Sequence, residues 1–297
     1  MEELFNKCNI CPRECNVNRN KGELGYCGAS NKIKIGGYHL HMWEEPIITG
    51  KKGSGTIFFS YCNLRCIYCQ NYDISINNNG EEISIERFSD ICLLLQEMGA
   101  ENINLVTPSH YIPLIREGLI MAKRKGLIIP IVYNTSGYEK VSSLKLLDGL
   151  VDIYLPDFKY YDKELNKYSN VNNYFEITRE ALKEMYRQVG KPVIKKGIMK
   201  RGVIVRHLVL PSHIDDSKRV IKYLFDNYGN NIYLSIMNQY TPIRRCKYLE
   251  LNNRVSEEEY DEIIDYAYDL GVRKCFVQDK ESQEESFIPV FKGDSVI

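Results

Sequence analysis

The chain has 297 residues, of which 44% are hydrophobic and 26% are charged, a composition typical of a globular protein with a large core. Its 39 lysine and arginine residues balance 39 aspartate and glutamate residues, which argues against a dedicated nucleic-acid-binding protein, since such proteins usually carry a basic excess. No apolar run reaches the roughly 18–20 residues of a membrane span, and the start of the chain lacks the features of a signal peptide. We therefore expect a cytoplasmic protein that binds neither nucleic acid nor membrane.

The first 50 residues are predicted to form a small irregular extension, rich in cysteine, glycine and asparagine, with one strand at Lys32–Leu40. From residue 51 onward strands and helices alternate. The predicted strands cover 56–60, 102–106, 127–133, 151–155, 203–210 and 232–236, with a further terminal strand possible at 273–278. The predicted helices cover 84–98, about 112–125, roughly 174–189, and a segment that starts at a Ser256–Glu259 capping box and ends near Gly271.

This alternation predicts a parallel sheet with helices on its outside. About six strand–helix units favour an α/β fold with a partial (β/α)6 barrel over a closed barrel of eight units. We expect two domains, a Cys-rich extension at 1–50 and the partial barrel at 51–297. In such barrels the chemistry lies in loops at the carboxyl ends of the strands, so those loops are the first place to look for a site.

Cysteine is concentrated near the amino terminus, where seven of the ten cysteines lie within the first 69 residues. Clustered cysteines in a reducing compartment point to metal binding or catalysis before disulfides. Cys62, Cys66 and Cys69, here called the triad, form a C-x3-C-x2-C pattern directly after the first strand of the repeating part. Thiolates so spaced can hold an iron–sulfur cluster, and three ligands on four irons leave one iron open to another molecule. Three structural cysteines, or a zinc site completed from elsewhere, are the alternatives.

The segment 61–71 resembles the cluster-binding motif of the radical SAM superfamily, which has this spacing and an aromatic residue before the third cysteine, here Tyr68. The resemblance implies a [4Fe–4S] cluster whose open iron binds the amino and carboxylate groups of S-adenosylmethionine. One electron from the cluster would cleave that cofactor into methionine and a 5′-deoxyadenosyl radical, which abstracts hydrogen from a substrate. Tyr68 is then expected near the adenine, with part of the contact made by its backbone.

The wider sequence from Gly53 to Asn71 is similar to the activating enzymes of glycyl radical enzymes, above all to homologues of pyruvate formate-lyase activating enzyme with extra cysteines before the triad. Segments 43–46, 107–111, 134–138 and 206–211 also fit that group. The resemblance implies a glycyl radical protein as substrate and a flavodoxin or ferredoxin-type reductant, for which the basic residues between 195 and 201 are one docking candidate, although a solvated turn is the simpler interpretation. A radical SAM enzyme that modifies a peptide or small molecule is the alternative. A non-catalytic iron–sulfur or zinc protein is disfavoured, because an electron carrier normally has four cysteine ligands.

Polar residues at later strand ends are predicted to bind the cofactor. Asn134 and Ser136 follow the third strand, and Arg206 lies at the end of the fifth. Asp157 and Lys159 follow the fourth strand and match the Asp-x-Lys with which the activases help to hold S-adenosylmethionine. Asp157 can accept hydrogen bonds from the ammonium group or the ribose, and Lys159 can pair with the carboxylate. A surface ion pair, or an ordinary salt bridge at Arg206, is the alternative. No side chain is assigned as a catalytic acid, base or nucleophile.

One segment departs from the family pattern. Many radical SAM enzymes carry a Gly-Gly-Glu-like segment after the second strand, which binds the methionine amino group, but residues 106–110 contain no carboxylate. The hydroxyls of Thr107 or Ser109, or backbone carbonyls, are candidates to replace it. His110 can serve the substrate or can be a hydrogen-bonded structural residue.

A second cysteine group precedes the triad. Its four members form a C-x2-C-x3-C-x11-C pattern: Cys8, Cys11, Cys15 and Cys27. Four soft ligands satisfy a tetrahedral metal completely, so zinc, a second [4Fe–4S] cluster and no metal at all stay open. A bound metal would supply folding free energy to an extension that has little core of its own. The remaining cysteines, Cys92, Cys246 and Cys275, are expected to be packing residues.

Overall fold

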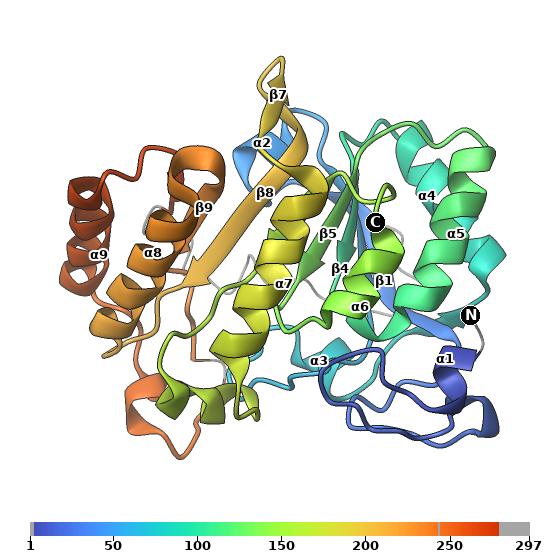
Figure 1. Cartoon of the computed structure of the whole chain (residues 1–297), viewed down its shortest axis with the longest axis horizontal. Helices are drawn as coiled ribbons and strands as arrows, with labels where there is room; N and C mark the ends of the chain where they lie inside the picture. The colour runs from blue at the N-terminus through green and yellow to red at the C-terminus, as the bar shows by residue number, and fades with distance from the viewer. Residues whose placement is uncertain (1–2, 243, 279–297) are drawn as a thin grey trace.

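The computed structural model describes residues 3–242 and 244–278, and a ten-stranded sheet runs through it in the order β10–β9–β8–β6–β5–β4–β2–β1–β3, with β7 paired to β8 (Figure 1). The strands are β1 (Ile33–His41), β2 (Ser54–Phe59), β3 (Glu81–Ile83), β4 (Ile103–Val106), β5 (Ile131–Thr135), β6 (Ile153–Pro156), β7 (Val193–Lys195), β8 (Ile198–Leu208), β9 (Tyr233–Met237) and β10 (Cys275–Val277). The α-helices are α1 (Glu3–Asn6), α2 (Pro46–Thr49), α3 (Tyr72–Ser75), α4 (Ile85–Glu97), α5 (Ile112–Arg124), α6 (Val141–Leu144), α7 (Tyr174–Val189), α8 (Ile214–Tyr228) and α9 (Glu257–Leu270). Short 3-10 helices are η1 (Arg19–Lys21), η2 (Ser109–Tyr111), η3 (Lys145–Leu147), η4 (Lys163–Ser169), η5 (Gly229–Asn231) and η6 (Leu249–Asn252).

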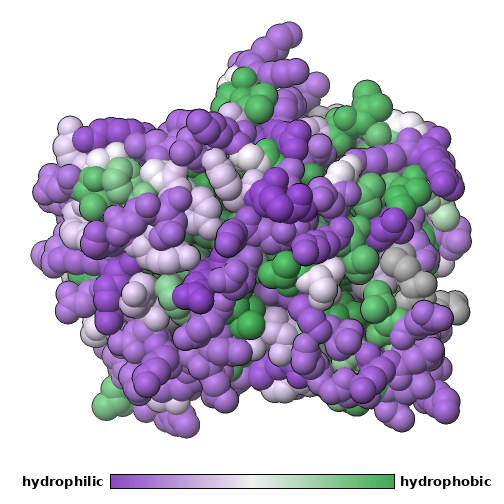
Figure 2. Space-filling view, viewed as in Figure 1, coloured by the Kyte–Doolittle hydropathy of each residue, from purple (hydrophilic) through white to green (hydrophobic). Residues whose placement is uncertain are grey.

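The strands from β2 to β10 along this order are parallel to their neighbours, whereas β1 pairs antiparallel with β2 and β3 antiparallel with β1. Helices α4 to α9 connect the parallel strands and lie in front of the sheet in Figure 1. On the face shown in Figure 2, which these helices cover, polar side chains predominate and hydrophobic ones are scattered. The predicted α/β partial barrel is confirmed.

On the inner face of the sheet, a layer of apolar side chains is followed by a layer of polar side chains nearer to the carboxyl ends of the strands. Val132, Leu155 and Ile204 belong to an apolar cluster that includes Ile48 of α2. Because side chains two residues apart share a face of a strand, the next inward residues are Asn134, Asp157 and Arg206. Several residues predicted to bind the cofactor therefore lie on the inside of the barrel, nearer to the carboxyl ends of the strands.

The largest difference from the predicted elements is α8, a helix between the fifth and sixth predicted strands that the sequence pattern did not indicate. Its buried face carries Val220, Ile221 and Leu224. The strand predicted at 127–133 is observed as β5, which begins only at Ile131. The preceding Pro130 has no N–H and so cannot donate a hydrogen bond within the sheet. The fifth begins earlier, at Ile198, where a hairpin joins it to β7. By contrast, α7 has the predicted bounds, and the capping box at Ser256 is present.

The amino-terminal extension packs against the carboxyl-end side of the sheet, near α3 in Figure 1. Its apolar residues Phe5, Ile10 and Ala29 join the same core cluster as the barrel. Ser143 Oγ donates to the carbonyl of Ile10 at 2.6 Å. The division at residue 50 stays a prediction, and residues 279–297 of the predicted second domain lie outside the described residues. Within 3–242 and 244–278, no helix has the length and apolarity needed to cross a membrane.

Candidate active site

The triad lies on a loop between β2 and α3. All six residues of β2 are buried, and the strand is paired on both sides, with β4 and β1, so the loop starts from a firmly held strand. The chain turns sharply at Tyr61 and Arg65, which have positive φ angles of 72° and 58°. Positive φ is uncommon for residues with a side chain and is typical of functional loops that the surrounding structure holds in place.

Each triad sulfur has a hydrogen-bonding partner. Cys66 Sγ lies 2.9 Å from Ser169 Oγ, and Cys69 Sγ lies 3.3 Å from Ser75 Oγ. The backbone N–H of Leu64 donates to Cys62 Sγ at 3.3 Å. Donors aimed at sulfur stabilise thiolates and tune the clusters that they hold.

Burial raises the pKa of all three triad thiols, that of Cys69 to about 12. The thiols are near enough for the charge of Cys66 to raise the pKa of Cys62 further, and for that of Cys62 to raise the pKa of Cys69. Within the described ranges, no three Cys, His, Asp or Glu side chains are arranged to hold a single metal ion. A cubane cluster instead distributes its thiolates over separate irons, and three neighbouring sulfurs with local donors fit that requirement. Cluster binding would have to displace the thiol protons.

A charged network lies beside the triad, on the inside of the barrel. Lys159 Nζ is 2.6 Å from Asp157 Oδ2, and Arg206 Nε donates to Asp157 Oδ1 at 3.0 Å. Arg206 Nη2 also donates to Asn134 Oδ1 at 2.6 Å. Three strand ends thus bring four of the predicted residues together. The Lys159 and Asp157 side chains are only 12% and 17% exposed, which excludes the surface ion pair considered as the alternative.

The charges in this network support one another. Burial by itself would raise the pKa of Asp157, but the Lys159 and Arg206 cations outweigh it and hold that pKa below its usual value. Burial opposes the charge of Lys159 as well, yet its pKa is raised because Asp157 and Cys66 are close. The positive charge of Lys159 therefore reaches the triad directly, at Cys66.

Ser136 and Tyr68 border the same region. Ser136 is buried and its Oγ has no hydrogen-bond partner, so the hydroxyl is available to a ligand. The Tyr68 hydroxyl contacts that of Tyr160, which lies 2.9 Å from Ser169 Oγ. Because Ser169 also contacts Cys66, the ring of Tyr68 is held by the same hydroxyl chain as the triad.

Two carboxylates that the sequence did not assign also reach the network. Glu44 Oε2 accepts from Asn134 Nδ2 at 3.5 Å, and its Oε1 is 3.8 Å from Arg206 Nη1. Burial, with a smaller contribution from Glu44, raises the pKa of the neighbouring Glu45 to about 7. Both precede α2, whose packing on the inner face directs them into the barrel. Two signals in the sequence pointed to them: segment 43–46 fits the activating-enzyme group, and the acidic pair stands directly before the apolar, proline-initiated α2.

The loop after β4, which lacks the carboxylate of the family pattern, contacts the carboxylate of Glu139, a residue that follows β5. Ser109 Oγ and Thr135 Oγ1 donate to Glu139 Oε1, and the Tyr133 hydroxyl donates to it at 3.3 Å. Burial raises the pKa of Glu139 to about 7. The Ser109 hydroxyl is therefore engaged in the core. Of the replacements considered for the missing family carboxylate, this leaves Thr107, at a φ of 58°, and backbone carbonyls.

The four cysteines of the extension lie together and line one cavity with Arg13, Arg19 and His110, so the spacing in the sequence corresponds to one place in the fold. Burial lowers the pKa of His110 to about 3, which keeps its ring neutral. Elsewhere, Cys92 is fully buried in α4, as expected for a packing residue. Cys246 and Cys275 are half-buried, and neither lines this cavity.

The chain matches the model of the Radical SAM superfamily over residues 56–224. It is 31% identical over 283 residues to the uncharacterized protein MJ0674 of Methanocaldococcus jannaschii, a match that covers 90% of this chain and 75% of that protein. It is also 26% identical over 248 residues to the uncharacterized protein MJ0808 of the same organism, covering 75% of this chain and 67% of the relative.

Solved structures with a similar fold include methylornithine synthase (PylB), with a TM-score of 0.52 and 17% identity, and Streptococcus suis SuiB bound to S-adenosylmethionine, with a TM-score of 0.54 and 11% identity. Both alignments cover 75% of this chain but only 63% and 49% of those chains, so the chain spans less than two thirds of either. At these identities the likeness shows the fold alone. Because the family model covers more than half of the chain and includes the triad, the protein belongs to the radical SAM superfamily, whose enzymes use a [4Fe–4S] cluster to cleave S-adenosylmethionine.

Proposed function

We propose that this enzyme abstracts the α-hydrogen of a glycine residue in a partner protein and so installs a glycyl radical. The proposal rests on the sequence resemblance to the glycyl radical activating group at the triad and at the strand-end segments. The observation that carries it is the inner network of Asn134, Asp157, Lys159 and Arg206, which gathers these strand-end residues next to Cys66.

The residues have separate tasks in this proposal. Cys62, Cys66 and Cys69 would hold the cluster, and S-adenosylmethionine would supply the 5′-deoxyadenosyl group that takes up the glycine hydrogen after one electron has been delivered by a flavodoxin or ferredoxin-type reductant. Lys159 would pair with the cofactor carboxylate, and Asp157 would accept from its ammonium group or ribose. Arg206 and Asn134 fix the Asp157 carboxylate in position.

Access to the inner face suits a substrate as large as a protein loop. In the described part of the chain β3 and β10 are the two ends of the sheet, so the barrel is not closed on itself.

The test follows hydrogen from the substrate. The enzyme is reconstituted anaerobically with iron and sulfide, reduced with dithionite, and mixed with S-adenosylmethionine and a candidate glycyl radical protein labelled with α-deuterated glycine. We expect deuterium in the 5′-deoxyadenosine by mass spectrometry and a glycyl doublet by electron paramagnetic resonance. Cofactor cleavage without deuterium transfer from any candidate protein would contradict the glycine proposal and favour a peptide or small-molecule substrate.

A further inference from the structure

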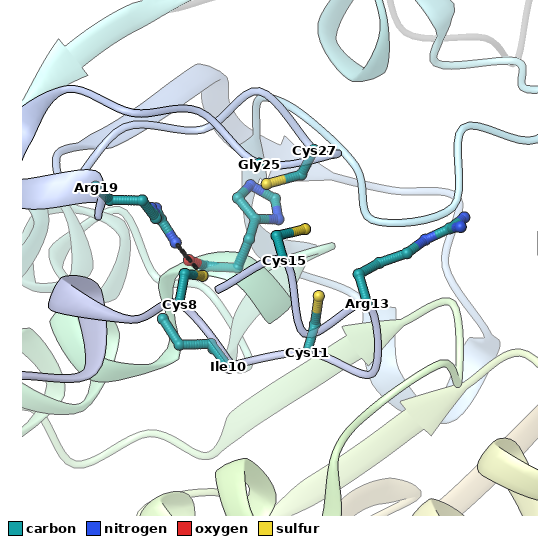
Figure 3. Close-up of a pocket in the computed structure, with 9 residues that line it drawn as sticks. Cys8, Ile10, Cys11, Arg13, Cys15, Arg19, Gly25 and Cys27 are labelled. Atoms are coloured by element: carbon teal, nitrogen blue, oxygen red, sulfur yellow. Dashed lines mark hydrogen bonds between the residues drawn. The ribbon is translucent and has the colours of Figure 1, made fainter. Parts of the chain in front are cut away.

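The sulfurs of Cys8, Cys11, Cys15 and Cys27 point into a common space between two turns of the extension (Figure 3). Cys8, Cys11 and Cys27 are at most 8% exposed, and Cys15 is half-buried. An isolated cysteine is readily explained as a small packing residue. Four that converge from a segment with little apolar core of its own need another explanation.

Three of the four sulfurs accept an N–H. The backbone N–H of Tyr26 donates to Cys15 Sγ at 3.3 Å and that of Ala29 to Cys27 Sγ at 3.5 Å. The buried guanidinium of Arg19 lies 3.9 Å from Cys8 Sγ, as the dashed line in Figure 3 marks. Such donors stabilise thiolates, and thiolates are the form in which cysteine binds metals.

His110 adds an independent observation. Its Nε2 lies 2.8 Å from the carbonyl of Ser60, and because a carbonyl oxygen only accepts, Nε2 carries the proton. The other ring nitrogen, Nδ1, is then an acceptor, and it is buried without a partner although the ring lines the cysteine cavity. A buried acceptor without a donor costs free energy, so the described protein groups alone leave the lining of this cavity incomplete.

We propose that Cys8, Cys11, Cys15 and Cys27 bind a second metal centre through four thiolates, and that this centre clamps the loop of the triad. Zinc and a [4Fe–4S] cluster share this ligand chemistry, but in the described ranges the four sulfurs are not arranged around a single ion, which favours the larger cluster. The experiment below separates the two. Four cysteines leave no position open, so the role of the centre is to fix structure.

The clamp consists of hydrogen bonds between the extension and the triad loop. Arg13 Nε donates to the carbonyl of Asn63 at 2.9 Å, and the Tyr26 hydroxyl donates to that of Leu64 at 3.1 Å. In return, Arg65 Nη2 donates to the carbonyl of Cys27 at 3.1 Å.

All three extension residues in the clamp are a metal ligand or lie within two residues of one. Ordering of the ligand loops by a metal would therefore order the donors that hold the backbone between Cys62 and Cys66. His110 holds the carbonyl of Ser60, just before the triad, from the same cavity.

The first experiment measures metal in a full-length variant in which all three triad cysteines are alanine, so that any metal belongs to the extension. We expect, after anaerobic reconstitution, either one zinc or about four iron and four sulfide ions per chain. Adding Cys11→Ala and Cys27→Ala should remove them. A folded triad variant, checked by circular dichroism, that binds neither metal would overturn the proposal. This result does not depend on cofactor cleavage, so it stands apart from the proposed function.

The second experiment removes one clamp bond and leaves every cysteine in place. Tyr26→Phe deletes the hydroxyl that holds Leu64, and Tyr38→Phe is the matched control, because it deletes an exposed hydroxyl that accepts from Arg87. We expect Tyr26→Phe to keep the second metal, to alter the electron paramagnetic resonance signal of the reduced triad cluster, and to lower the kcat of cofactor cleavage about two- to tenfold. An unchanged signal and rate, with the second metal bound, would refute the clamp.

Discussion

The two cysteine sites differ in how their ligands are completed. The triad offers three thiols, of which Cys69 is half-buried, and two of the three have serine hydroxyls as partners. It lies next to a charged network on the inside of the barrel. The extension offers four thiols, three of which have N–H donors, in a cavity that none of the network residues lines. The comparison teaches that the number of ligands, and what lies beyond them, separates a centre that can take part in chemistry from one that can only hold the chain.

The largest expected effect tests this difference directly. Cys66→Ala should abolish the formation of 5′-deoxyadenosine, because the cluster loses one of its three protein ligands. Cys11→Ala should mainly lower soluble yield and thermal stability. Both are measured by chromatography of the reaction mixture and by thermal melting. If both variants fold normally and lose cofactor cleavage to the same extent, the triad is not the only cysteine group with a part in the chemistry.

The network beside the triad gives the next largest effect. Lys159→Met removes the cation that faces Asp157 and Cys66, so we expect the KM for S-adenosylmethionine to rise about 10- to 100-fold. The matched control is Lys222→Met, which breaks the exposed ion pair with Asp226 at 2.9 Å and should leave the KM unchanged. If both variants bind the cofactor like the parent enzyme, Lys159 is only structural.

Glu139 lies between the two regions, since Ser109 bonds to it and its neighbour Lys140 donates to the carbonyl of Asn9 in the extension. Its pKa of about 7 exceeds the ordinary value of 4.5, so the folded protein retains a proton that the unfolded chain loses. The stability from that proton is complete below about pH 4.5 and is lost as the pH rises through about 7.

Glu139→Gln should therefore remove up to ~3 kcal/mol of pH-dependent stability between those limits. Melting temperatures at about pH 5 and pH 8 test this expectation. We expect the parent enzyme to lose stability relative to the variant at the higher pH. If the melting temperatures of the parent enzyme and the variant change by the same amount between these pH values, Glu139 is ionised at both.

The smallest effect is expected at Tyr68. Tyr68→Phe removes the hydroxyl that contacts Tyr160 but keeps the ring and the backbone. If the adenine is contacted through the backbone, the KM for S-adenosylmethionine should change less than about threefold, because the deleted hydroxyl then makes no hydrogen bond to the cofactor. Titration with the cofactor measures it, and a tenfold or larger change would assign the hydroxyl a part in binding.

The sequence predicts the inner network well because parallel strands place their carboxyl ends side by side. Once the strands that carry Asn134, Asp157 and Arg206 were recognised, the geometry of a parallel sheet predicted that these three side chains lie close together. Glu44 and Glu45 could not be placed in this way, because their direction depends on the long-range packing of α2 against β8.

Capping helped to predict one helix but does not explain every case. The capping box at Ser256 marks the start of α9 in the sequence, whereas His213, the residue before α8, makes no capping hydrogen bond. Helix α7 also lacks a capping hydrogen bond, yet its bounds were predicted. In the same way, cysteine spacing predicts that the extension has a shared site. It does not predict that Arg13 and Tyr26 reach the triad loop, since those contacts join residues far apart in the chain.

The hairpin of β7 and β8 has a consequence for the delivery of electrons. It precedes β8, so it stands at the amino ends of the parallel strands, while the triad follows the carboxyl end of β2. The 11 residues of β8 alone span about 36 Å at ~3.3 Å each. A reductant bound to the basic side chains of this hairpin would face the wrong pole of the molecule. A reductant that binds at the opposite side of the molecule would have a shorter path to the triad, because the half-buried Cys69 and Arg244 line one cavity there.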